Sequence, residues 1–194
     1  MGQLPNWLDI TADSQLTSHA MLIPWGLLAQ EIGLIKGIQR VPIPQRTRDY
    51  APQAKSLELF AAILKGSAYL QDISRGPHPL DQDQAVARAW CQEGWADYSG
   101  VSRTLKVCTS DTVGALEAVL AEVSRPFLDQ EVMLALRDRQ VLVYDGDLTG
   151  HPVSNSSTSY PGAAFGWMSD EVRLGYQAAL VSMHSPTTTA CGCR

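Results

Sequence analysis

Two carboxylates, Asp145 and Asp147, stand where an apolar run opens into turn residues within the segment Gln140-Val-Leu-Val-Tyr-Asp-Gly-Asp-Leu-Thr149. The β-branched residues predict a buried strand that leads into a loop. Side chains alternate along a strand, so Val143, Asp145 and Asp147 point the same way. Carboxylates at the end of a buried strand are costly unless they bind a cation or act as acid, base or nucleophile. The pattern therefore predicts a divalent-ion site, with a plain Asp-Gly turn as the equal alternative.

A basic stretch covers residues 36–55, where five cationic residues face only one acidic residue, Asp49. Three prolines in the stretch predict an extended connector rather than a helix. An extended basic connector suits the phosphate backbone of a nucleic acid, and a solvated linker is the alternative. The candidate nucleic-acid-binding residues are Lys36, Arg40, Arg46, Arg48 and Lys55.

The elements that must position these residues are helical first and extended later. Apolar residues at steps of three and four predict helices over 56–74, 109–124 and 127–138, with Arg125-Pro126 interrupting the last two. Acidic residues that suit a helix N-terminus predict another helix over about 81–91. The large side chains of Trp90 and Trp95 are expected to fill the core between the helices. The periodicity then changes to two, and it predicts strands over 140–149 and 172–183 around a loop at 150–162.

Composition limits the classes of protein that remain. The 194 residues carry a net charge of −5 with 45% hydrophobic residues, which is typical of one globular domain. No signal peptide and no uninterrupted apolar stretch of membrane-spanning length is present, so we expect a cytoplasmic protein without a membrane partner. The four cysteines, at positions 91, 108, 191 and 193, are expected to be reduced thiols.

The segment Asp145-Gly-Asp147-Leu-Thr149 resembles the opening motif of the haloacid-dehalogenase phosphatases, in which the first Asp attacks a phosphoryl group. That family needs a Lys and further metal-binding acids from later strands. The 45 residues that follow Thr149 contain no lysine, and their only acids are Asp170 and Glu171, which we expect in a solvated turn. The phosphatase interpretation is therefore the weaker one.

The chain as a whole resembles the front half of DDE-type insertion-sequence transposases, which have an RNase H-like catalytic domain. The resemblance covers residues from about 16 to 184, and it rests on several segments rather than on one motif. These segments are residues 16–35, the basic stretch, Leu59-Phe-Ala-Ala-Ile-Leu-Lys-Gly-Ser-Ala-Tyr-Leu-Gln-Asp72, Ser102-Arg-Thr-Leu, Tyr144-Asp-Gly-Asp-Leu-Thr149, Pro152-Val-Ser and Tyr160-Pro-Gly-Ala-Ala-Phe-Gly.

The resemblance implies an enzyme that cuts and joins DNA at transposon ends, in which three acids hold two Mg²⁺ or Mn²⁺ ions. Asp147 matches the first of these acids best, and Asp145 is the alternative. The second Asp and the Glu of the family should come from later elements. We expect this chain to be a truncated, catalytically incomplete transposase, because the small, unpatterned residues 185–194 do not continue the strand pattern.

The predicted fold class is α+β: a helical N-terminal region followed by the first strands of an incomplete RNase H-like sheet. The expected divisions are 1–35 (helical), 36–55 (connector), 56–139 (helical), 140–184 (start of the catalytic domain) and 185–194 (tail). An incomplete sheet exposes unpaired backbone groups, so self-association is expected. The alternative from another class is a non-catalytic helical interaction module whose strands form only a docking hairpin.

Overall fold

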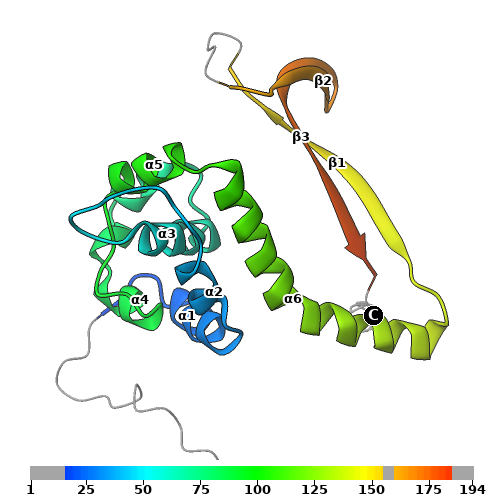
Figure 1. The fold of residues 1–194 in the computed structure, drawn as a ribbon, viewed down its shortest axis with the longest axis horizontal. Helices are drawn as coiled ribbons and strands as arrows, with labels where there is room; N and C mark the ends of the chain where they lie inside the picture. The colour runs from blue at the N-terminus through cyan, green and yellow to red at the C-terminus, as the bar shows by residue number, and fades with distance from the viewer. Residues whose placement is uncertain (1–15, 155–159, 185–194) are drawn as a thin grey trace, which may run out of the picture. The chain divides into compact units, whose positions relative to one another are not determined.

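The computed structural model describes residues 16–154 and 160–184, which form six α-helices and three β-strands (Figure 1). The chain divides into two compact units, residues 1–124 and 125–194. The predicted mixed α and β class, with helices before strands, is confirmed. The α-helices are α1 (Leu22–Glu31), α2 (Leu34–Gln39), α3 (Pro52–Lys65), α4 (Gln84–Ala89), α5 (Tyr98–Lys106) and α6 (Ser110–Arg139), and the strands are β1 (Tyr144–Pro152), β2 (Ala164–Met168) and β3 (Glu171–Met183).

The core of the first unit lies among its helices and includes both predicted tryptophans. Trp90 and Trp95 are 1% and 3% exposed. Trp90 follows α4 directly, and its indole Nε1 donates a hydrogen bond to the backbone oxygen of Leu22 in α1, at 3.0 Å. A side chain that is apolar over most of its area and satisfied at its one polar atom joins two helices far apart in the sequence.

Helix α3 begins and ends earlier than the predicted helix over 56–74. Pro52 occupies its first turn, where a missing N–H costs nothing. Gly66 ends the helix in the left-handed conformation, with φ of 86°. A short 3₁₀ helix, Leu70–Ile73, covers most of the remaining predicted length. Glycine adopts positive φ without strain, so Gly66 ends α3 before Arg75 is reached.

The predicted interruption at Arg125-Pro126 is wrong, because α6 runs through Pro126 without a break. Proline lacks one N–H and crowds the carbonyl one turn earlier, at Glu122. Just before it, the hydroxyl of Ser124 donates to the backbone oxygen of Leu120 at 2.7 Å. The two compact units divide between Ser124 and Arg125, directly before this proline.

The predicted connector over 36–55 is extended only in its centre. Lys36 belongs to α2, and Lys55 belongs to α3. The chain between Arg40 and Ala51 is without helix or strand, as its prolines predict.

The strands form one antiparallel sheet in the order β1-β3-β2. Tyr144 of β1 lies opposite Met183 of β3, and Met168 of β2 lies opposite Glu171. Strand β3 confirms the prediction over 172–183, whereas β2 was not predicted. The prediction that the first strand is buried and starts at residue 140 is wrong: β1 starts at Tyr144 and is exposed along most of its length.

Within the described ranges, no helix is both long and apolar enough to cross a bilayer.

Close packing of α2 against α6 gives a direct test of the first unit. A Cβ added at Gly37 would lie 2.5 Å from Val119 Cγ1. We expect Gly37→Ala to lower the free energy of unfolding by about 1–3 kcal/mol through overpacking, and Val119→Ala added to it to restore part of the loss. Urea denaturation followed by circular dichroism measures both.

Gly114 in α6 is the matched control for this test, because an added Cβ there meets no atom within 4 Å. Gly114→Ala should raise stability by about 0.5–1 kcal/mol, since alanine is the better helix former. Equal effects at Gly37 and Gly114 would contradict the packing argument.

Candidate nucleic-acid interface and acidic pair

The basic residues at the start of the predicted stretch lie at the end of a short helix. Lys36 is exposed on α2, and Arg40 follows the last residue of that helix. The guanidinium of Arg40 forms an ion pair with Glu122 of α6 at 3.1 Å, with both side chains 66% exposed. An exposed pair of this kind contributes little stability, so Arg40 is able to exchange Glu122 for another anion.

Arg46 and Arg48 lie on the extended segment between α2 and α3, and both are exposed. Three hydrogen bonds hold this segment. Thr112 Oγ1 donates to the oxygen of Pro42 at 2.8 Å, Thr104 Oγ1 to Gln45 Oε1 at 2.6 Å, and Gln53 Nε2 to the oxygen of Val41 at 2.8 Å. The segment is therefore fixed from three helices while its two arginines face outward.

Lys55 does not belong to this surface, although the sequence predicts it as a nucleic-acid contact. It is 6% exposed, because it lies on the side of α3 that packs into the core. Its positive charge acts instead on the nearby Glu58 carboxyl. Burial of Lys55 contradicts its predicted role as a nucleic-acid contact, since its position in α3 rather than local charge decides which way the side chain points.

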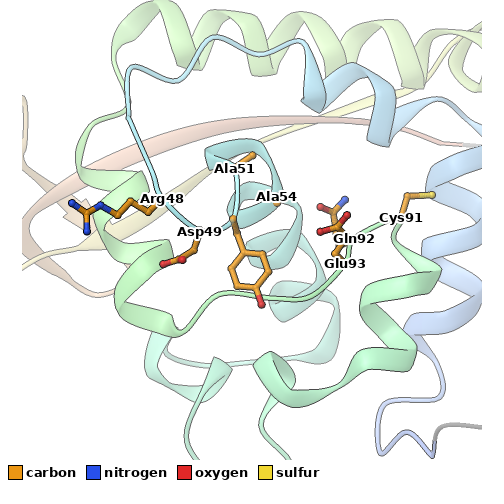
Figure 2. Close-up of a pocket in the computed structure, with 8 residues that line it drawn as sticks. Arg48, Asp49, Ala51, Ala54, Cys91, Gln92 and Glu93 are labelled. Carbon is orange, nitrogen blue, oxygen red and sulfur yellow. The ribbon is translucent and has the colours of Figure 1, made fainter.

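An open pocket of about 630 Å³ lies beside the extended segment (Figure 2). Figure 2 shows the Arg48 side chain at one end of the pocket and Cys91 at the other. The backbone of Cys91 is left-handed, with φ of 56°. Arg48 is the only base among the lining residues, which are Arg48, Asp49, Tyr50, Ala51, Ala54, Cys91, Gln92 and Glu93.

Asp145 and Asp147 lie on β1 with their side chains on the same face, as alternation predicts. Both are exposed, and Asp145 Oδ2 lies 3.0 Å from Nε2 of His184. The predicted reason for a cation site, which was the cost of burying two carboxylates, does not apply because β1 is not buried. Within residues 16–154 and 160–184, no group of three or more acidic, His or Cys side chains is arranged to hold a metal ion.

Of the two acids expected in a turn, Asp170 lies in one and Glu171 does not. Asp170 is in the turn between β2 and β3, and Glu171 is the first residue of β3. Glu171 accepts a hydrogen bond from Nε of Arg173 at 2.7 Å. The hairpin geometry thus accounts for both acids.

Glu58 is an ionisable residue in the interior of the first unit. It is fully buried in α3, and its Oε2 accepts a hydrogen bond from the backbone N–H of Ala96 at 2.9 Å. Its Oε1 and Oδ1 of Asp81 have no hydrogen-bond partner in the described part of the chain. Burial raises the pKa of Glu58 from 4.5 to about 8, with Asp81 and Asp97 adding to the effect. Glu58 lies three and four residues before Ala61 and Ala62, which are also buried, so this helical spacing was the feature of the sequence that could have indicated its burial.

Comparison of the chain with protein-family models, with curated proteins and with solved structures finds no match.

Proposed function

We propose that the protein binds DNA through Lys36, Arg40, Arg46 and Arg48, as a protein of the DDE-transposase type with an RNase H-like second part. The observation that carries the proposal is the exposed basic segment that three helices hold by hydrogen bonds. A preorganised row of cations loses little conformational entropy on binding a phosphate backbone. The resemblance in residues 16–184 supplies the DNA partner, the transposon ends.

Asp145 and Asp147 enter this proposal as ligands for Mg²⁺ or Mn²⁺, with Asp147 as the first acid of the family's set. They share one face of β1, and exposed carboxylates are the ligands that hard divalent ions prefer. Two carboxylates do not hold two ions alone, so strand cleavage needs further ligands from outside the described residues. The proposal for this chain is accordingly DNA binding rather than cleavage.

Salt dependence of DNA binding tests the proposal. If four cations each displace one condensed counterion, log K falls with log salt with a slope of about −3.6, so affinity drops about 150-fold between 50 and 200 mM salt. We expect Arg46→Ala/Arg48→Ala to reduce the slope by about 1.8 and to weaken binding equally for different duplex sequences. Fluorescence anisotropy with a labelled duplex measures both quantities.

The matched control removes two exposed arginines from the second unit, Arg125 and Arg137, which already pair with Asp129 and Asp138. The variant Arg125→Ala/Arg137→Ala changes net charge by the same amount, and its salt slope should stay that of the parent chain. Undetectable binding at 50 mM salt, or equal losses in the two double variants, would argue for the non-catalytic interaction module instead.

A further inference from the structure

The outer edge of β1 is unpaired within the part of the chain that the structure describes. Strand β1 pairs with β3 on one side, and the described residues place no strand on its other side (Figure 1). Its residues are mostly exposed, with Leu148 at 65%. An exposed edge strand presents a row of N–H and C=O groups that pair readily with another strand.

The register decides which backbone groups face outward. The N–H of Val153 donates to the oxygen of Leu174 at 2.9 Å, and the N–H of His184 donates to the oxygen of Val143 at 3.0 Å. In an antiparallel ladder the residues that bond to a given neighbour alternate, so the odd-numbered residues of β1 bond to β3. The even-numbered residues therefore point their backbone groups outward, and they are Tyr144, Gly146, Leu148, Gly150 and Pro152.

We propose that two copies of this chain form a dimer in which their β1 strands pair antiparallel about a two-fold axis at Leu148. This register sets outward-facing residues opposite each other, as the hydrogen-bonded pairs of an antiparallel ladder require. Leu148 then faces the second copy's Leu148, Gly146 faces Gly150, and Tyr144 faces Pro152. Pro152 has no N–H to donate, and because it lies at the end of the paired segment, the ladder loses only a terminal hydrogen bond.

Charge complementarity supports the same register. The odd-numbered residues form the non-hydrogen-bonded pairs, where opposing side chains come closest. Asp145, whose Oδ2 already lies 3.0 Å from Nε2 of His184 in its own chain, also faces the second copy's His151. Asp147 faces the second copy's Thr149, whose hydroxyl is a donor for the carboxylate. The two-fold axis repeats each pair. The Asp147 side chains of the two copies are only diagonal neighbours, at about 7–8 Å.

Neighbouring registers fit less well. An axis at Asp147 sets the two Asp147 carboxylates directly opposite each other, which is destabilising. An axis at Thr149 leaves Tyr144 and Asp145 without opposite residues in β1 and sets Leu148 against a glycine. Only the axis at Leu148 pairs the whole of β1 without opposing like charges.

Sedimentation velocity over a range of protein concentrations tests dimer formation. We expect a species of about twice the 21.1 kDa chain mass. Leu148→Lys should abolish it, because two lysines would meet at the axis. The matched control is Phe165→Lys on β2, a similarly exposed apolar residue, which should leave the dimer intact. A monomer at every concentration, or masses beyond a dimer, would overturn the proposal.

A charge exchange tests the Asp145–His151 pairing. Asp145→Lys should weaken the dimer about tenfold, since the carboxylate that faces the His151 imidazole is lost from both pairs. Adding His151→Glu should restore it, because the exchanged charges again attract. Failure of the double variant to recover, with the parent chain dimeric, would reject this register.

Cysteine cross-linking identifies the register directly, in a chain whose four native cysteines are replaced by serine. Opposed residues in a hydrogen-bonded pair lie about 5.5 Å apart, within disulfide range. Leu148→Cys should therefore form a disulfide dimer on oxidation, whereas Asp147→Cys and Thr149→Cys should not. Cross-linking at 147 or 149 instead, or loss of the dimer in Val181→Lys on the open side of β3 but not in Leu148→Lys, would assign the interface elsewhere.

Discussion

Replacing Glu58 by glutamine is expected to stabilise the protein at alkaline pH and to leave its stability at pH 4 nearly unchanged. Glu58 is fully buried, and burial raises its pKa from 4.5 to about 8. Glutamine has nearly the same shape and is able to accept the same hydrogen bond from Ala96. It carries no charge, so it avoids the cost of a buried carboxylate.

The direction of the effect follows from proton binding. Between pH 4.5 and 8 the folded state keeps the Glu58 proton while the unfolded state has lost it. Stability therefore falls as pH rises through this window, by about 1.4 kcal/mol for each unit of pKa difference. The loss of stability caused by Glu58 is expected to reach several kilocalories per mole at pH 9. No loss is expected below pH 4.5, where Glu58 is protonated in both the folded and the unfolded state.

Urea denaturation at a series of pH values from 4 to 9 measures this effect as the difference between the parent chain and Glu58→Gln. The difference should grow with pH and level off above about pH 8. Glu117→Gln, at an exposed position on α6, is the matched control and should give a constant difference near zero. A pH-independent difference for Glu58→Gln would show that its carboxyl is not protonated in the folded protein.

Trp90→Ala is expected to lower the free energy of unfolding by about 3–5 kcal/mol, the cost of emptying a large buried site. Trp90 is 1% exposed and joins the end of α4 to α1 through its bond to Leu22. Trp90→Phe keeps most of the volume but leaves the Leu22 oxygen without its donor, which costs about 1–3 kcal/mol. Urea denaturation followed by far-UV circular dichroism gives both values.

Trp95 separates the hydrogen bond from the volume change. It is 3% exposed, and its Nε1 has no hydrogen-bond partner among the residues that the structure describes. Trp95→Phe removes an unsatisfied donor as well as some volume, so it should cost less than Trp90→Phe. Equal losses would mean that the bond to Leu22 contributes nothing beyond packing.

Sequence patterns correctly predicted the features that depend only on residues close together in the chain. The core positions of Trp90 and Trp95, the strand over 172–183 and the turn at Asp170 are confirmed, because aromatic bulk, alternation and turn residues act over a few neighbours. Element ends were predicted less well. Gly66 ended α3 early, and α6 continued through Pro126. A single proline removes one backbone hydrogen bond, and the remaining bonds of a long helix keep it continuous.

The burial of several side chains depends on contacts between segments that lie far apart in the sequence. The sequence predicts Lys55 in an extended connector, yet this residue belongs to α3 and is buried. Glu58 of the same helix is also buried, and it accepts a hydrogen bond from the N–H of Ala96. The strand at Asp145 is predicted to be buried, yet among the described residues β3 is the only strand that pairs with it. Burial of a side chain depends on what packs against its element, and an apolar run alone does not specify that packing.

The sequence by itself determined the helical first part, the later strands, and the row of cations from Lys36 to Arg48, because composition and periodicity fix these locally. The tertiary structure alone decided that threonines of α5 and α6 hold that row in place, that Lys55 is buried away from it, and that no described strand pairs with the outer edge of β1. These features arise from contacts between distant segments, and no local rule of propensity encodes such contacts.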